Sequence, residues 1–173
     1  MLLLGPNGSG KTTLLRALAG FKELTEGRLF WRDKPLSHDS FDLEMNGRIN
    51  FLGALEDGLV AQWTVFENLH FWGFLFEGSS NRVDHMISRF QLEQLLDQRI
   101  LSLSSGQRRR VSMARIASSP CPIWLLDEPT IALDKAGIAL LERTIQEHRQ
   151  DGGIVVIATH ADVKLDDATT LYL

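Results

Sequence analysis

The residues most clearly suited to binding a ligand lie near the start of the chain, where residues 5–12 read GPNGSGKT. The spacing G-x-x-x-x-G-K-[ST] is that of a loop whose backbone N–H groups face one concavity, with a helix N-terminus behind them. Lys11 can then reach the β- and γ-phosphates of a nucleotide, and the hydroxyl of Thr12 can bind Mg²⁺. The stretch therefore predicts a nucleoside triphosphate site. Its expected binding residues are Gly5, Pro6, Asn7, Gly8, Ser9, Gly10, Lys11, Thr12 and Thr13.

An acidic pair, Asp127 and Glu128, closes the apolar run PIWLLDE at residues 122–128. Ligands of open parallel sheets bind at the carboxyl ends of buried strands, and these acids stand at such an end. Asp127 is placed to hold Mg²⁺ through water, and Glu128 to orient or deprotonate an attacking water. The plainer alternative is that the acids cap the next helix. A phosphate loop in the same chain favours the catalytic interpretation.

Further functional residues are expected at the ends of two other elements. Ser104, Ser105 and Gly106 stand at a helix start, where free N–H groups and a hydroxyl offer another anion-binding site. His160 ends the apolar run IVVIATH, whose strand should lie beside the nucleotide strands and aim the imidazole at the γ-phosphate. We expect the remaining histidines at the surface: His38, His70, His85 and His148. The arginines that follow Gln107 are expected to face solvent or a neighbour: Arg108, Arg109 and Arg110.

Strands and helices alternate along the chain in an order that could position these residues. Apolar runs bounded by glycine or acids predict strands, and apolar positions three and four residues apart predict helices. The expected strands are 1–4, 27–36 (with a turn), 49–53, 122–128, 154–160 and 170–173; the expected helices are 11–20 and 135–150, with three more within about 63–118. This order predicts an α/β fold with a mostly parallel central sheet. The helical block at about 63–118 is expected to be an inserted lobe.

Composition narrows the possible classes of protein. The 173 residues suit one domain, 1–173, and 44% hydrophobic with 23% charged residues is ordinary for a globular protein. The formal net charge of −4 gives no sign of the basic surface that nucleic-acid-binding proteins carry. With one cysteine, Cys121, the chain can form no internal disulfide. Its apolar runs are far shorter than the roughly 20 residues of a membrane helix, so any membrane role is expected to come through a partner.

The motifs GPNGSGKT, LSSGQ, LLDEPT and ALD, followed by His160, resemble in order and spacing the ATPase domains of ABC transporters. The resemblance covers the whole chain and implies a P-loop NTPase that hydrolyses ATP with Mg²⁺. It also implies a head-to-tail homodimer around two ATP. In that dimer Ser104 and Gly106 of one subunit would complete the site around Lys11 of the other, and Asp134 would belong to the D-loop. The helical lobe would dock on a transmembrane partner.

Less generic stretches point to one branch of that family. Residues 20–36, 50–72, 102–116 and 166–173 are similar to the ATPases of cytochrome c maturation, described as haem exporters. That similarity implies a peripheral protein at the cytoplasmic face of the bacterial inner membrane, acting with membrane-spanning Ccm subunits. Nothing in the chain looks like a haem ligand set, so no direct haem ligation is expected. The alternatives are an ABC ATPase for another substrate and a truncated nucleotide-binding subunit with little hydrolysis.

The chain departs from the family pattern in two places. Ala54 stands where the family offers a glutamine or histidine to the metal; Glu56 is the candidate substitute, and Gln62 lies too far along the chain. We therefore expect weakened metal binding or coupling. Family members also carry antiparallel strands and an adenine-stacking aromatic residue before the phosphate loop. Only residues 1–4 precede the loop here, so we expect an N-terminally short domain that lacks both.

Overall fold

The computed structural model describes residues 1–54, 57–160, 163, 165 and 167–173. Its centre is a sheet in the order β4-β5-β6-β1-β7, in which every pair of neighbouring strands is parallel. This confirms the predicted α/β fold with a mostly parallel sheet. The strands are β1 (Leu2–Leu4), β4 (Ile49–Leu52), β5 (Ile123–Asp127), β6 (Ile154–Ala158) and β7 (Thr170–Tyr172).

The register of the sheet brings the expected site residues to one edge. Asp127 at the end of β5 pairs with Ala158 at the end of β6, and Leu3 of β1 pairs with the same Ala158. The carboxyl ends of these parallel strands therefore lie together. Since neighbouring strands are about 4.8 Å apart, β6 separates the strand before the phosphate loop from the acid-bearing strand by only about 10 Å in total.

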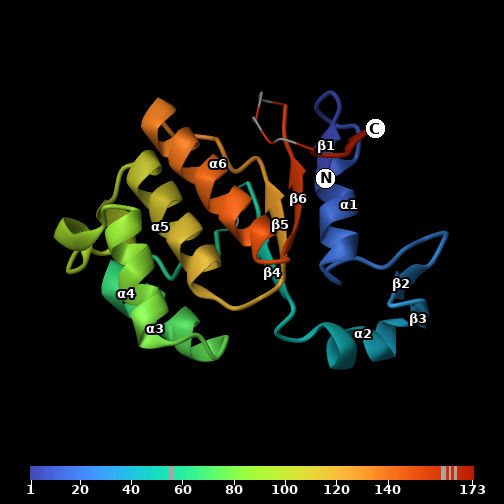
Figure 1. The fold of residues 1–173 in the computed structure, drawn as a ribbon, viewed down its shortest axis with the longest axis horizontal. Helices are drawn as coiled ribbons and strands as arrows, with labels where there is room; N and C mark the ends of the chain where they lie inside the picture. Colours follow the sequence, from blue (N-terminus) through green and yellow to red (C-terminus); the bar gives the residue numbers. More distant parts are fainter. Residues whose placement is uncertain (55–56, 161–162, 164, 166) are drawn as a thin grey trace.

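Helices cover both faces of the sheet (Figure 1). On one face α1 (Lys11–Leu18) packs against β5 and β6. On the other, α5 (Ser105–Ser118) contacts β4 and α6 (Lys135–Gln150) contacts β6. The helices α3 (Val65–Leu75) and α4 (Ser80–Arg89) pack on α5, further from the sheet. Every residue of β5 is buried, as its continuous apolar run predicted.

The side chains of β5 alternate between two hydrophobic clusters, one on each face of the sheet. Trp124 and Leu126 belong to the larger cluster, on the side of α5 and α6. Leu125 belongs to the smaller one, which contains Leu15 of α1. Because the strand that carries Asp127 is packed on both sides, its end is held at a fixed place in the fold.

The remaining elements show where the sequence reading was incomplete. The expected strand and turn at 27–36 form an antiparallel hairpin, β2 (Leu29–Trp31) and β3 (Lys34–Leu36), and Arg32 and Asp33 both have positive φ in its turn. The helix α2 (His38–Met45) was not predicted, because it is short and only weakly amphipathic. The other short elements are the 3₁₀ turns η1 (Glu93–Leu95) and η2 (Ile100–Ser102). Within the described residues, no helix has the length and apolar character needed to cross a bilayer.

Candidate nucleotide-binding and hydrolysis site

The loop between β1 and α1 has the features of a phosphate site. Gly8 and Gly10 have φ of 84° and 102°, a left-handed conformation that favours glycine. Gly10 is the N-cap of α1 and no side chain caps this helix, so the N–H groups of its first turn are open to an anion. The Ser9 hydroxyl is buried and has no hydrogen-bond partner among the described residues. A phosphate in the loop would satisfy these orphaned donors.

The side chain of Lys11 lies within this loop. The residue is 7% exposed, and its Nζ donates to the Gly5 carbonyl at 2.7 Å and to the Pro6 carbonyl at 2.9 Å. An ammonium group has three N–H donors, so one remains for a phosphate oxygen. The loop thus presents a positive charge as well as backbone donors at one point.

Thr12 joins the phosphate loop to the acidic strand. Its Oγ1 donates to Oδ2 of Asp127 at 2.8 Å, and Asp127 is 2% exposed. Neighbouring oxygens around octahedral Mg²⁺ are about 3 Å apart, so this pair fits one edge of a Mg²⁺ coordination shell. Among the residues that the structure describes, no group of three or more His, Cys, Asp or Glu side chains could hold a metal by itself. A Mg²⁺ at this pair would take its other ligands from water and phosphate.

Glu128 and His160 also meet at this edge of the sheet. Oε1 of Glu128 lies 2.8 Å from Nδ1 of His160, and its Oε2 accepts from Oγ1 of Thr159 at 3.1 Å. The backbone of Glu128 is left-handed, with φ of 47°, a rare conformation that is often found at functional sites. His160 is 62% exposed at its side chain. A carboxylate oriented in this way can accept a proton from a water at the open edge.

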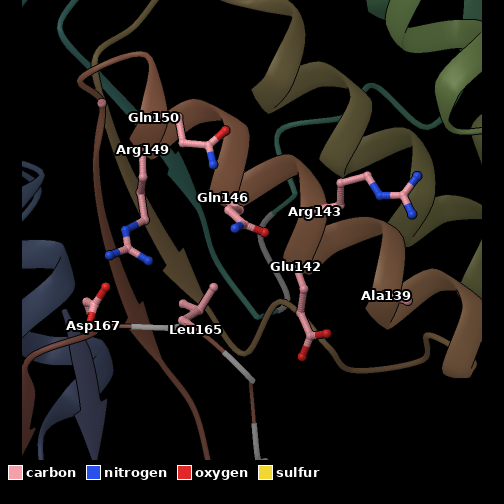
Figure 2. Close-up of a pocket in the computed structure, with 9 residues that line it drawn as sticks. Ala139, Glu142, Arg143, Gln146, Arg149, Gln150, Leu165 and Asp167 are labelled. Carbon is pink, nitrogen blue, oxygen red and sulfur yellow. The ribbon is translucent and has the colours of Figure 1, made fainter.

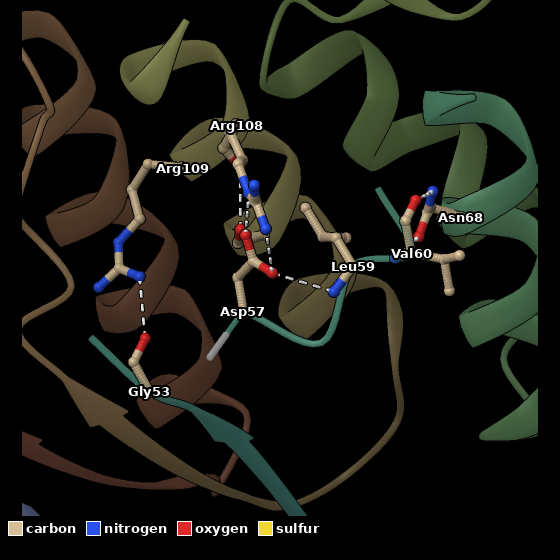
Figure 3. A network of polar contacts seen from close by, with 8 residues as sticks. Gly53, Asp57, Leu59, Val60, Asn68, Arg108 and Arg109 are labelled. Carbon is tan, nitrogen blue, oxygen red and sulfur yellow. Dashed lines mark hydrogen bonds and ion pairs between the residues drawn. The ribbon is translucent and has the colours of Figure 1, made fainter. Parts of the chain in front are cut away.

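Arg109 was not predicted as part of this region, and the expectation that it faces solvent or a neighbour is wrong. It is 6% exposed and donates to the carbonyls of Asp127, Glu128 and Pro129. It also donates to the Gly53 carbonyl, as Figure 3 shows. The helical spacing of Arg109 with the buried residues Ser112, Met113 and Ile116 was a usable signal, because it puts the arginine on the inward face of α5.

The signature residues have local structural roles within this chain. Ser104 is the N-cap of α5, where its Oγ accepts from the Gln107 N–H at 3.2 Å and its own N–H donates to Gln107 Oε1 at 2.9 Å. A Cβ on Gly106 would lie 2.9 Å from the Ala132 carbonyl, so the close approach requires glycine. Asp134 caps α6 by accepting from the Gly137 N–H at 2.7 Å. A role in nucleotide binding stays a prediction for Ser104, Gly106 and Asp134. For Ser104 and Gly106 the predicted role is in the site of a partner subunit.

The segment after β4 carries the departure from the family pattern. Ala54 is half-buried, directly after the Gly53 carbonyl that Arg109 binds, and its methyl group cannot coordinate a metal. Gln62 is exposed, and Glu56 lies outside the described residues. Whether Ala54 weakens metal binding therefore stays a prediction.

Of the histidines expected at the surface, His148 is placed differently. It stacks on Trp124 at 3.8 Å between ring centroids and is only half-exposed. Burial lowers the pKa of His148, and the nearby charge of Arg82 acts in the same direction. His85 is exposed and His70 is half-buried, whereas the side chain of His38 lies outside the described part of the chain. None of these histidines has a contact that would link it to the phosphate loop in the described structure.

A separate hollow of about 490 Å³ runs along α6 (Figure 2). Its lining is mostly polar, and it contains none of the residues predicted to bind or hydrolyse nucleotide. In this view Arg143 and Arg149 project to opposite sides of the helix, and Arg149 extends toward Asp167. The residues predicted to act on nucleotide lie elsewhere, at the phosphate loop, Asp127 and Glu128, and their role stays a prediction.

Comparisons with known proteins identify the family and agree with the fold. The model of the ABC transporter family matches residues 1–131. The chain is 44% identical to the "Cytochrome c biogenesis ATP-binding export protein CcmA" of Paramagnetospirillum magneticum, over 100% of this chain and 80% of that protein. It is 43% identical to the CcmA protein of Rhodospirillum rubrum, over 100% of this chain and 73% of that protein.

Solved structures show the same relationship in three dimensions. A dimeric structure of the ATP-binding cassette MJ0796, in a post-hydrolysis state bound to ADP and Pi, has a TM-score of 0.79 and 27% identity, and the match covers 92% of this chain and 74% of the other. The family model, the relatives and the solved structure agree. The chain belongs to the ABC transporter family and is an ABC-type ATPase.

Proposed function

We propose that this chain is the ATP-hydrolysing subunit of a cytochrome c maturation complex, in which ATP hydrolysis powers haem delivery through membrane partners. The observation that carries the hydrolytic part is the carboxylate of Glu128, bound by Thr159 and His160 beside the Thr12–Asp127 pair. The biological part is supported by relatives at 44% and 43% identity that are named as cytochrome c biogenesis ATP-binding export proteins.

Each site residue has a distinct task in the proposed reaction. The backbone N–H groups after Gly8 and the ammonium of Lys11 bind the β- and γ-phosphates of ATP. Thr12 and Asp127 would hold Mg²⁺, which supplies charge neutralisation on those phosphates when bound. Glu128 orients the attacking water and accepts its proton, and His160 fixes the Glu128 carboxylate and faces the γ-phosphate.

The proposed assembly follows from what a single chain leaves open. Ser104 and Gly106 lie at the N-terminal end of α5, where the positive end of the helix dipole suits a phosphate. In a head-to-tail homodimer they would complete the nucleotide site of the partner subunit, and Asp134 would lie at the same contact. The helical lobe of α3, α4 and α5 would dock on membrane-spanning Ccm subunits at the cytoplasmic face of the inner membrane. We propose no haem ligand on this chain.

A second candidate is a nucleotide-binding subunit that hydrolyses ATP slowly or not at all. Ala54 favours it, because a methyl group replaces the side chain expected to contact the metal. An ABC ATPase that serves another substrate is the third possibility, and it shares the geometry of the first.

One experiment separates these candidates. A bacterium whose own ccmA gene is deleted receives this chain or its Glu128→Gln variant, and haem-stained c-type cytochromes are measured together with ATPase activity of the membranes. The proposal expects cytochromes with the unaltered chain and none with the variant. ATP hydrolysis without cytochromes would indicate another substrate. Nucleotide binding without hydrolysis would favour the second candidate.

A further inference from the structure

We propose that Arg109 is a positioning residue for ATP hydrolysis, which holds the turn that carries Glu128 and connects this turn to the segment after β4. The proposal rests on the hydrolytic role of Glu128 given above. Arg109 does not touch the reacting atoms in this account; it acts through the backbone of the catalytic residue.

The hydrogen bonds of Arg109 converge on one short turn. Its Nη2 donates to the carbonyls of Asp127 (3.0 Å) and Glu128, and its Nε donates to the Pro129 carbonyl at 3.1 Å. Carbonyls of consecutive residues in an extended strand point in alternating directions. For the carbonyls of three consecutive residues to face one guanidinium, the backbone must turn sharply at Glu128. The left-handed φ of 47° at this residue makes that turn. The planar fork of arginine donors is suited to such a cluster of acceptors.

The left-handed turn at Glu128 determines where its side chain points. Its backbone N–H donates to the Ala158 carbonyl at 2.8 Å, which docks the turn on the end of β6. The carboxylate then reaches Thr159 and His160, the next two residues after that strand end. Without Arg109, the left-handed turn would lose the N–H donors that bind its carbonyls and compensate its strain. Glu128 could then relax and separate from His160.

A fourth bond extends this network to the segment after β4. Nη1 of Arg109 donates to the Gly53 carbonyl at 3.2 Å. The preceding residue, Arg108, binds the carboxylate of Asp57 with both Nε and Nη2, and Asp57 Oδ1 accepts from the Leu59 N–H at 3.1 Å. Figure 3 shows these contacts on one side of α5. Two consecutive arginines of one helix therefore bind Gly53 and Asp57, two residues of the chain after β4.

The network matters more in this chain because Ala54 stands where the family has a glutamine or histidine. Ala54 lies between the Gly53 carbonyl and Asp57, and it has no polar side chain that could touch the metal. In the described structure, the connection from this segment to Glu128 runs through the guanidinium of Arg109. Burial lowers the pKa of Arg109, but the charges of Asp57, Asp127 and Glu128 oppose that effect. Arginine is not deprotonated in proteins, so a charged donor stays available to the turn.

A buried arginine could instead serve only to stabilise the fold, and Arg115 is the matched comparison. It lies on the same helix and is 3% exposed, with bonds from Nη1 to Asn50 Oδ1 at 3.2 Å and from Nη2 to the Phe51 carbonyl at 2.9 Å. Those partners belong to β4 and not to the turn at Glu128. Removing either arginine should lower stability, but only Arg109 should alter the orientation of Glu128.

The test uses the full chain with Arg109→Gln, Arg109→Lys, Arg115→Gln and Glu128→Gln. The readout that does not depend on activity is the ¹⁵N NMR spectrum of the His160 imidazole. We expect Arg109→Gln to move these resonances in the direction seen in Glu128→Gln, because both changes disturb the Glu128–His160 contact. Arg109→Lys keeps the charge but loses donors, so it should shift the His160 resonances less. It should also fold even if Arg109→Gln fails to fold. Arg115→Gln should leave the resonances at their unaltered positions.

The kinetic readout separates this proposal from the function on which it rests. For Arg109→Gln we expect kcat for ATP hydrolysis to fall by about tenfold or more while the Kd for ATP changes by less than about threefold. The double variant Arg109→Gln/Glu128→Gln should be no slower than Glu128→Gln alone. His160 resonances unchanged in both Arg109 variants would overturn the positioning role, whatever the activity. Equal turnover in the unaltered chain and in Glu128→Gln would instead overturn the hydrolytic assignment and leave the NMR comparison decisive for Arg109.

Discussion

Replacing Glu128 with glutamine removes one negative charge and the proton acceptor while keeping the shape of the side chain. Among the described residues the carboxylate bonds to Thr159 and His160, and a glutamine carbonyl oxygen can still accept one of these bonds. The backbone bond from its N–H to the Ala158 carbonyl does not involve the side chain. The variant should therefore fold normally and bind ATP with a Kd within about threefold of the unaltered chain.

The expected loss is in turnover. Removing a positioned general base costs about 10²- to 10⁴-fold in rate, which is about 2.7–5.5 kcal/mol in transition-state free energy at about 1.4 kcal/mol for each factor of ten. The phosphate loop and the Thr12–Asp127 pair are untouched, so this loss should appear in kcat and not in ATP affinity.

The assay is phosphate release at saturating ATP and Mg²⁺, together with binding of a fluorescent ATP analogue. Glu93→Gln is the matched control, because Glu93 is an exposed acid in the turn η1 and its change should leave both values unaltered. A kcat for Glu128→Gln within threefold of the unaltered chain would refute the role given to this carboxylate. A fall in ATP affinity as large as the fall in kcat would show that the side chain acts in binding.

Three further changes test other parts of the account. Thr12→Val removes the donor to Asp127 and a metal ligand, so Mg²⁺ should strengthen ATP binding about tenfold less than in the unaltered chain, measured by titration with and without EDTA. Leu69→Ala empties a fully buried position in α3 and should lower the free energy of unfolding by about 2–5 kcal/mol in urea. Because burial lowers the pKa of His148 below its ordinary 6.5, its contribution to stability is present above that pH and is lost as pH falls through the folded-state pKa. His148→Phe, which can keep the stack on Trp124, should flatten the dependence of unfolding free energy on pH between about 8 and 5.

Much of the fold could be predicted from the sequence because several elements carry a strong local pattern. The apolar run before Asp127 indicated a strand buried on both faces, and β5 is that strand. The helix expected at 135–150 is α6, with the same bounds. In both cases hydrophobic periodicity and the flanking residues favour the structure that the tertiary fold adopts. By contrast α2 has little periodicity of its own and could not be recognised in this way.

The missed residues have their roles through partners distant in sequence. Arg109 is charged and follows two other polar residues, so local reasoning put it at the surface. It is buried because the carbonyls of Gly53 and of the turn after β5 converge on it, which only the packed fold reveals. His148 is placed against Trp124 for the same kind of reason. Spacing along a helix can suggest such burial, but it does not identify the acceptors that compensate a buried cation.

The central claim is that the phosphate loop and the acidic end of β5 bind one Mg²⁺–ATP. A crystal structure of Glu128→Gln with ATP and Mg²⁺ tests it most directly. The account predicts the β- and γ-phosphates around Nζ of Lys11, with the metal bound to Oγ1 of Thr12 and linked to Asp127. Nucleotide bound elsewhere, or a metal that engages neither Thr12 nor Asp127, would contradict it.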